Sequence, residues 1–279
     1  SALSNHEKGL RWRSKCPDPV LLSLNVNSRF IHVQDRSILN SAQDCVVFGS
    51  DGICTKGKDI RWIHRLNVAI MSLPDTDPQK YHLRIPRLLE VQRRIAANVS
   101  LADSFSTDFV AGVDQAFLGE LIISGAVLLN VADRVIARAS SAMKAAFPYV
   151  PGLLSFREGP AAIRAVKELR PKPTLLFVDG CGINHPRRAG LASFIGIMLD
   201  LPTIGISKRV LCGEGEQVGH LLKSKDGCRP IVVAPGHRVS MQSSLDLARR
   251  YIGGGKLPEP CRLAHEHANL VKRDLTGRY

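Results

Sequence analysis

The distribution of apolar residues along the chain changes near Ile85. Upstream, in residues 1–84, short apolar stretches alternate with basic residues, and no period persists for more than a few positions. Downstream, apolar residues recur at the three- and four-residue spacing of one helical face, which predicts an amphipathic helix at the start of a domain over residues 85–279. The residues on this face are Leu88, Val91, Ile95 and Val99.

Three apolar stretches with short connections follow this helix. They are residues 109–113, 121–129 and 134–139. Connections of this length join antiparallel strands, so a three-stranded meander is predicted. Beyond Glu158, helical patterns alternate with apolar strands at residues 174–178 and 203–206, which implies parallel pairing. The remaining candidates are strands at residues 218–222 and 231–234, a helix marked by Leu245, Ala248 and Ile252, and a last helix over residues 261–275.

These elements together predict an α/β fold. Its sheet is mixed, with three antiparallel strands followed by parallel strands, and helices flank it. This is the element order of the ribonuclease H-like fold, although unrelated α/β proteins share it. No internal repeat supports another architecture.

Composition and charge narrow the classes of partner. At 279 residues and 44% hydrophobic content, the chain can bury one sizeable core. Its formal net charge is +13 at pH 7. An excess of Lys and Arg attracts polyanions by releasing their counterions, so nucleic acid is the first partner to consider. The alternative is an enzyme that is basic for other reasons.

Cysteine usage and hydropathy bear on the compartment. The seven cysteines include no C-x-x-C pair, so neither a zinc ribbon nor a disulfide framework is indicated. No apolar run reaches the ~18 residues that a membrane span needs, and no secretory leader is recognised. We expect a monomeric cytoplasmic protein with reduced thiols and no membrane partner.

Acidic residues close two of the predicted strands, where a strand buried on both faces has no structural use for a carboxylate. Asp114 ends the stretch 109–113, and Asp179 ends the stretch 174–178. A third acid, Glu158, precedes a helical run. Two of these acids have an ordinary alternative role, because Asp179 precedes a glycine as turn residues do and Glu158 would complement the charge of a helix start.

Three carboxylates that converge in a partly dry site would repel one another, and a divalent cation would compensate for this repulsion. Oxygen ligands suit Mg²⁺, with Mn²⁺ as a substitute. Such an ion can hold a phosphate oxygen, lower the pKa of a water molecule and stabilise the leaving oxygen. Asp114, Glu158 and Asp179 therefore predict metal-dependent hydrolysis of phosphodiesters.

Three longer motifs contain these acids: residues 110–114 (VAGVD), 147–158 (FPYVPGLLSFRE) and 177–188 (FVDGCGINHPRR). Shorter blocks follow at residues 202–208 (PTIGISK), 235–240 (PGHRVS) and 257–260 (LPEP). In order and spacing, from about residue 86 onward, this series resembles the endonuclease V family. The family fold is ribonuclease H-like, and its metal-binding carboxylates match the three acids derived above.

The resemblance implies a specific reaction. The enzyme would use Mg²⁺ to nick DNA at the second phosphodiester bond 3′ to a deaminated purine such as deoxyinosine, leaving 3′-hydroxyl and 5′-phosphate ends. An inosine-specific endoribonuclease is the alternative, since a contact to a 2′-hydroxyl leaves no recognisable short motif.

The resemblance also implies residues that recognise the base. Residues Pro148, Tyr149, Val150 and Pro151 match a rigid wedge whose aromatic ring fills the gap left by a displaced base. The base itself would rotate into a pocket where close backbone approach favours glycine. The pocket residues that match are Gly152, Leu154, Gly180, His185 and Gly190.

The same resemblance implies roles for four further residues. Lys208 matches a lysine near the scissile phosphate, and His237 matches a histidine beside the metal centre. Arg187 and Arg188 are expected to grip phosphates. One departure is Gln242, which stands where relatives often carry an acid. A second is the short loop at residues 213–216.

The sequence leaves two other functional classes to consider. A catalytically silent nucleic-acid-binding protein would lack the intact carboxylate set, and another ribonuclease H-like nuclease would lack the Pro-Tyr-Val-Pro wedge. Residues 1–84 lie outside the resemblance. Their basic charge and aromatic residues would suit an accessory nucleic-acid-binding segment, but the preferred interpretation is an extension of unknown fold that is poorly ordered or not native to the functional protein.

Overall fold

The computed structural model describes residues 78–146, 148–208, 218–225 and 227–277, and all structural statements refer to these residues. Most of the predicted extension over residues 1–84, and the short loop at residues 213–216, lie outside them. No helix in the described part of the chain is both long and apolar enough to cross a membrane.

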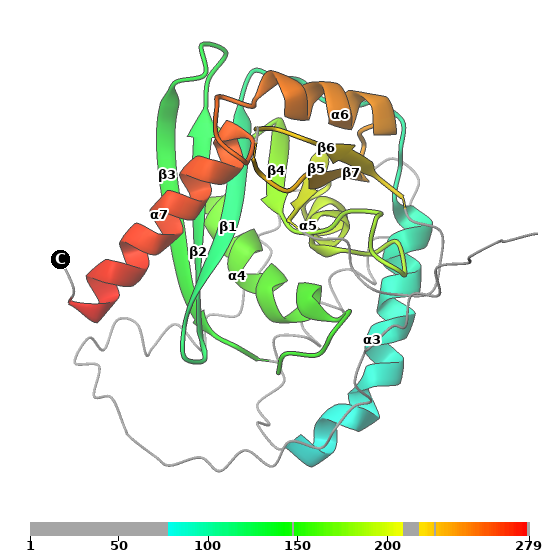
Figure 1. The fold of residues 1–279 in the computed structure, drawn as a ribbon. Coiled ribbons are helices and arrows are strands. Elements are labelled where there is room, and N and C mark those ends of the chain that lie inside the picture. Colours follow the sequence, from blue (N-terminus) through cyan, green and yellow to red (C-terminus); the bar gives the residue numbers. More distant parts are fainter. Residues whose placement is uncertain (1–77, 147, 209–217, 226, 278–279) are drawn as a thin grey trace, which may run out of the picture. The chain divides into compact units, whose positions relative to one another are not determined.

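A seven-stranded sheet forms the centre of the fold, in the order β3-β2-β1-β4-β5-β7-β6 (Figure 1). Strands β1 to β3 form the predicted antiparallel meander, and β4 pairs in parallel with both β1 and β5. Strands β7 and β6 extend the sheet antiparallel, a direction that their apolar pattern did not reveal. The strands are β1 (Val110–Leu118), β2 (Leu121–Leu129), β3 (Val135–Lys144), β4 (Leu175–Asp179), β5 (Thr203–Ser207), β6 (His220–Leu222) and β7 (Ile231–His237).

Helices cover both faces of the sheet, so that buried hydrophobic residues lie on each face. Successive residues of β4 alternate between them, because Leu176 and Val178 pack with α3, α4 and α5, whereas Leu175 and Phe177 pack with α6 and α7. This double burial explains why β4 is apolar without interruption until Asp179. The helices are α3 (Pro78–Asn98), α4 (Leu154–Glu168), α5 (Leu191–Leu199), α6 (Met241–Arg250) and α7 (Glu259–Thr276).

Helix α3 confirms the amphipathic helix expected from the sequence. Leu88, Val91 and Ile95 are buried in the core, while Val99 lies just past the end of the helix and packs partly against that core. The helix begins at Pro78, upstream of the predicted domain boundary at Ile85, so a cut at that boundary would divide it.

Helix α7 lies directly on β1 and β2, as Figure 1 shows. Glycines allow this close approach: a Cβ added at Gly112 would stand 1.9 Å from the carbonyl oxygen of Pro260, and one added at Gly125 would stand 2.5 Å from the amide of Ala268. The absence of side chains at these two positions sets how closely the helix packs on the strands.

Replacing Gly112 with alanine should therefore disturb this contact. We expect Gly112→Ala to lower the free energy of unfolding by about 3 kcal/mol, the upper end of the usual effect of overpacking, because backbone atoms must move. Denaturation in urea would measure the change. Gly253→Ala is the control, since the nearest atom to its added Cβ is 3.6 Å away, and it should change stability by less than about 0.5 kcal/mol. Equal effects of the two substitutions would contradict this account.

Candidate active site

Asp114 and Asp179 stand side by side on adjacent parallel strands. The pairing of β1 with β4 runs in register up to Val113 and Val178, and the next residue on each strand is the aspartate. Neighbouring strands are about 5 Å apart, and residues in register point to the same face. Both aspartates therefore face α7, because Val113 and Val178 pack into the core on the opposite face.

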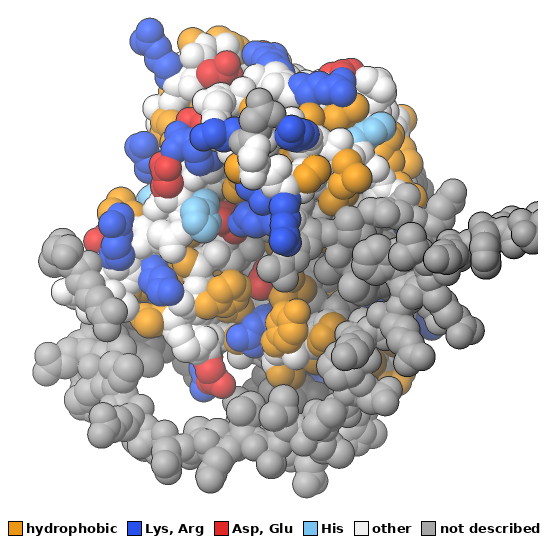
Figure 2. Space-filling model, in the orientation of Figure 1, with side chains coloured by type: hydrophobic (Ala, Val, Ile, Leu, Met, Phe, Trp, Pro, Cys, Tyr) orange, Lys and Arg blue, Asp and Glu red, His pale blue; other side chains and the backbone are white. Residues whose placement is uncertain are grey.

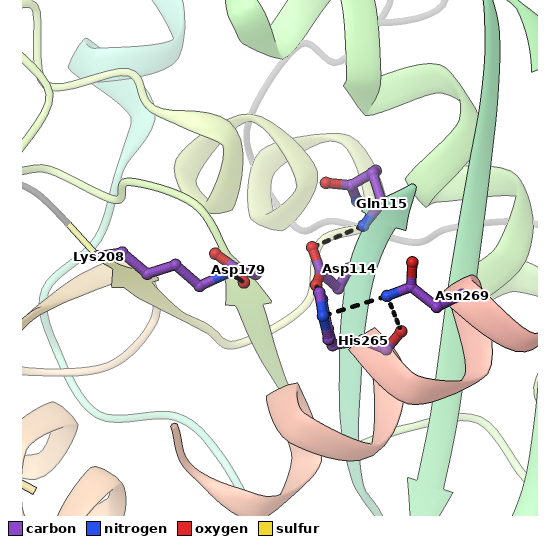
Figure 3. Close-up of polar contacts among 6 residues, drawn as sticks. All are labelled: Asp114, Gln115, Asp179, Lys208, His265 and Asn269. Carbon is purple, nitrogen blue, oxygen red and sulfur yellow. Dashed lines mark hydrogen bonds and ion pairs between the residues drawn. The ribbon is translucent and has the colours of Figure 1, made fainter. Parts of the chain in front are cut away.

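Asp114 is buried and accepts two hydrogen bonds (Figure 3). The backbone amide of Gln115 donates to its Oδ1 at 2.7 Å, and Nδ1 of His265 lies 2.6 Å from its Oδ2. Asn269 determines the tautomer of this histidine, because its amide nitrogen donates to the carbonyl oxygen of His265 at 2.9 Å and also faces Nε2 at 3.1 Å. Nε2 is thus the acceptor, and Nδ1 carries the proton that it donates to Asp114.

Asp179 forms an ion pair with Lys208, whose Nζ lies 2.6 Å from Oδ2 of Asp179 (Figure 3). Lys208 directly follows β5, whose residue Ile206 pairs with Asp179. Burial lowers the pKa of Lys208, but the charge and hydrogen bond of Asp179 outweigh this effect and raise the pKa overall. The lysine is therefore held in its charged form beside the carboxylates.

Glu158 is the third predicted acid, and it lies in the first half of α4 with only 7% of its surface exposed. Burial, and then the charge of Asp114, raise the pKa of Glu158 to about 7. Burial, and then the charge of Asp179, raise the pKa of Asp114 to about 6. The charges of Asp114 and Asp179 thus oppose the ionisation of Glu158, and the charge of Asp179 opposes that of Asp114, although α4 and α7 lie on opposite faces of the sheet.

A shared metal site is not formed by the side chains as they stand, since no three His, Cys, Asp or Glu residues in the described part of the chain make a set that could hold a metal ion. Asp114 and Asp179 are instead hydrogen-bonded to His265 and Lys208. The donor chemistry nevertheless fits a hard divalent cation, because buried carboxylates that repel one another gain from a positive charge. A common metal for the three acids stays a prediction.

The wedge residues form a loop between β3 and α4. Tyr149 is 69% exposed, Pro151 is also exposed, and Pro148 and Val150 are half-buried. Leu154 is half-buried at the first position of α4. The ring of Tyr149 is thus exposed between two prolines, and its stacking on a base stays a prediction.

The predicted pocket glycines are required by the protein's own packing. A Cβ at Gly190 would stand 2.2 Å from the carbonyl oxygen of Cys181, and one at Gly180 would stand 3.0 Å from the Cβ of Leu191. His185 and Gly152 come together, with Nε2 of His185 3.1 Å from the carbonyl oxygen of Gly152. Gly180, His185 and Gly190 therefore lie in the segment between β4 and α5, and His185 connects this segment to Gly152, which lies before α4.

Arg187, which was predicted to grip phosphates, makes contacts within the protein. Its guanidinium points inward and donates to Oε1 of Gln92 at 2.5 Å and to the carbonyl oxygen of Gly152 at 2.6 Å. Both acceptors are far away in the sequence, so pattern analysis could not identify them. Arg188 adopts a left-handed conformation with φ of 55°, and its guanidinium lies 3.4 Å from the carbonyl oxygen of Ile183.

His237 does not reach this site, which corrects its expected place beside the metal centre. It pairs with Thr203 at the start of β5, whereas Lys208 follows the other end of that strand. The length of β5 separates them by about 13 Å. The ring is buried there, where its Nδ1 accepts a hydrogen bond from the amide of Ser100 at 3.2 Å. The antiparallel direction of β7 accounts for the error, because it takes His237 to the opposite end of the sheet.

His265 is the residue of the site that the sequence did not reveal. It is an exposed residue of an amphipathic helix, without the strand-end position that identified the aspartates. The only local sign of its role is the pairing of His265 with Asn269, one helical turn apart. Such pairs are common on exposed helices, so this sign is not specific.

Comparison with known proteins now identifies the family. The family model of endonuclease V matches residues 93–266, and the endonuclease V of Archaeoglobus fulgidus is 39% identical over 212 residues, which cover 70% of this chain and 96% of that protein. The chain belongs to the endonuclease V family. Its enzymes are nucleases, hydrolases that act on phosphodiester bonds.

Other members support the same assignment. The endonuclease V of Azotobacter vinelandii is 41% identical over 200 residues, covering 64% of this chain and 90% of that protein. The structure of endonuclease V from Streptomyces avermitilis is 31% identical with a TM-score of 0.64, covering 68% of this chain and 94% of that one. The structure of the catalytic domain of human endonuclease V is 26% identical with a TM-score of 0.65, covering 70% of this chain and 98% of that one. The observed sheet, with these structural neighbours, confirms the ribonuclease H-like fold.

The raised pKa of Glu158 predicts a stability that depends on pH. The folded carboxyl keeps a proton up to pH about 7, whereas the unfolded one loses it near the ordinary value of 4.5, so this residue makes the protein less stable as the pH rises through that window. Without divalent cations, Glu158→Gln should therefore increase the free energy of unfolding at pH 8 by about 1–3 kcal/mol, and much less at pH 5.

Denaturation in urea at both pH values, in the presence of a chelator, would measure this difference. Glu168→Gln is the matched control, because Glu168 is exposed on the same helix, and its effect should be the same at pH 5 and pH 8. An effect of Glu158→Gln that does not vary with pH would show that the buried carboxylate is not destabilising.

Proposed function

We propose that this protein is a metal-dependent endonuclease that nicks DNA at the second phosphodiester bond 3′ to a deaminated purine, leaving 3′-hydroxyl and 5′-phosphate ends. The observation that carries the proposal is the side-by-side pair Asp114 and Asp179, with Lys208 and His265 bound to them and Glu158 close by. Family membership adds the reaction class, since this arrangement lies within the matched residues.

The charge of the protein suits a nucleic-acid substrate. The formal net charge is +13, and in Figure 2 Lys and Arg side chains are spread widely over the visible face. A related structure, endonuclease V of Ciona intestinalis, was determined with a 24mer DNA that contains an inosine followed by a ribo-adenosine. That protein is 20% identical to this chain with a TM-score of 0.64, covering 70% of this chain and 99% of that one.

Asp114, Glu158 and Asp179 would hold Mg²⁺, or Mn²⁺ in its place. A divalent cation bound by such acids supplies positive charge for the phosphate oxygens and makes a bound water molecule more acidic. The protein's own side chains supply the other contributions to the reaction. Lys208 offers an ammonium beside the carboxylates, and His265 holds its proton on Nδ1 and orients Asp114.

Recognition of the base would occur next to these acids. The exposed ring of Tyr149 can stack where a displaced base leaves the duplex. Glu158 and the wedge lie on one continuous segment, because the wedge loop leads directly into α4. A base held at the wedge would therefore be at a defined distance from the carboxylates.

The central experiment uses purified protein, Mg²⁺ and matched oligonucleotides that carry one inosine, in deoxy and ribo forms. Cleavage of the deoxy strand at the second bond 3′ to inosine, abolished by a chelator, would support the proposal. Cleavage of the ribo strand alone would identify an endoribonuclease. Binding without cleavage of either strand would identify a non-catalytic binding protein and overturn the proposal.

Removing one acid should separate cutting from binding. Asp179→Ala should lower the cleavage rate by at least about 100-fold, because the acid serves the reaction centre, while basic residues provide most of the affinity for DNA. Single-turnover cleavage and a binding titration on the same inosine duplex would measure both. A parallel loss of binding and cleavage in a folded protein would contradict this division.

Removing the exposed ring should weaken discrimination more than affinity. Base–aromatic stacking is worth roughly 1–3 kcal/mol, so Tyr149→Ala should lower the preference for inosine duplex over undamaged duplex by about 5- to 150-fold. Affinity for undamaged duplex should hardly change, because no cation is removed. Tyr149→Phe keeps the ring and is the control. An unchanged ratio of affinities in Tyr149→Ala, at one salt concentration, would mean that Tyr149 is an ordinary surface tyrosine.

A further inference from the structure

Three donors from two segments, both distant in sequence from Gly152, converge on its carbonyl oxygen. The amide of Gln92 donates to it at 2.8 Å, the guanidinium of Arg187 at 2.6 Å, and Nε2 of His185 lies 3.1 Å away. Gly152 ends the wedge loop, directly before α4, and has a φ of 78° that favours glycine. We call these four residues the Gly152 hub.

The hydrogen-bond directions within the Gly152 hub are determined by its partners. The backbone amide of Arg187 donates to Nδ1 of His185 at 3.1 Å, so Nε2 carries the proton and donates to Gly152. Burial, and then the charge of Arg187, lower the pKa of His185 to about 4, which keeps the ring neutral. All three partners of the carbonyl are therefore donors, and one of them is charged.

Gln92 uses both ends of its amide. While its nitrogen donates to Gly152, its Oε1 accepts from Nε of Arg187 at 2.5 Å, which closes a ring of contacts among three segments. The side chain is fully buried on α3, a helix anchored in the core by Leu88, Val91 and Ile95. A buried amide is satisfied at both ends only if the wedge loop keeps this position.

From this geometry we infer that Gln92 and Arg187 are positioning residues, which hold the wedge loop through the carbonyl of Gly152 and thereby set the enzyme's preference for the damaged base. The inference rests on the proposed function. Both guanidinium contacts of Arg187 are made within the protein, so the inference replaces the expected phosphate contact of this residue.

The position of the Gly152 hub explains why it would affect recognition of the damaged base. The loop before Gly152 carries Tyr149, and the helix after it carries Glu158. A carbonyl held at this junction fixes the stacking ring relative to the catalytic acid. Loosening it should let the wedge move while the basic residues that contact phosphates stay in place.

The test compares variants of the full chain on inosine-containing and undamaged duplexes. Gln92→Met removes both amide contacts and keeps a long apolar side chain. It should lower the ratio of the two affinities by about 5- to 50-fold, with little change in affinity for undamaged duplex. Ile95→Val is the matched control, because it weakens the packing of the same helix without removing a polar contact, and it should leave the ratio unchanged.

Thermal denaturation of each variant sets a working temperature at which all are folded. If Gln92→Met does not fold, Gln92→Glu takes its place, since it keeps an acceptor for Arg187 and loses the donor to Gly152. A folded Gln92 variant with an unchanged ratio would overturn the inference and leave the proposed function intact. A wild-type protein without any preference for inosine would instead overturn the proposed function.

Salt dependence provides a second readout, specific to Arg187. A residue that contacts phosphate contributes about one unit to the slope of log affinity against log salt concentration. Removing such a residue weakens binding to all duplexes alike. Arg187→Met should leave that dependence unchanged and lower the ratio of affinities. A shallower salt dependence with an unchanged ratio would assign Arg187 to phosphate binding and overturn its place in the inference.

Discussion

Repulsion between Asp114 and Asp179 is the constraint around which this part of the chain is organised. Two parallel strands in register, about 5 Å apart, bring the two aspartates to the same face, and burial prevents water from screening their charges. The protein compensates with partners from elsewhere, the ammonium of Lys208 after β5 and the ring N–H of His265 on α7. Because each partner belongs to a different element, the arrangement of the sheet and of α7 is inseparable from the electrostatics of the site.

How far the sequence predicts this arrangement depends on the range of the interactions. Apolar strands and the helical face of Leu88, Val91 and Ile95 are local patterns, so they were predictable. Asp114 and Asp179 were predictable for the same reason, since a carboxylate at the end of a buried strand is a local anomaly. The resemblance to a known family added Lys208, which the structure places beside Asp179.

Contacts between distant segments were not predictable in this way. His265 resembles any polar residue of an exposed helix until α7 is placed on β1. Gln92 and Arg187 are 95 positions apart, and only the folded chain brings them together. The misplacement of His237 has a related cause, because a motif shows which residues are neighbours in sequence but not which end of the sheet a strand reaches.

The position of α7 has a consequence for how the protein is made. A ribosome releases the chain from its N-terminus, so β1 and Asp114 emerge long before the helix that carries His265. Until α7 has been synthesised and has docked on β1 and β2, the carboxylate of Asp114 lacks this partner and the glycine-lined face of the sheet is uncovered. An unfinished chain therefore lacks one of the contacts that hold the carboxylate of Asp114, and this contact can form only after α7 has been made.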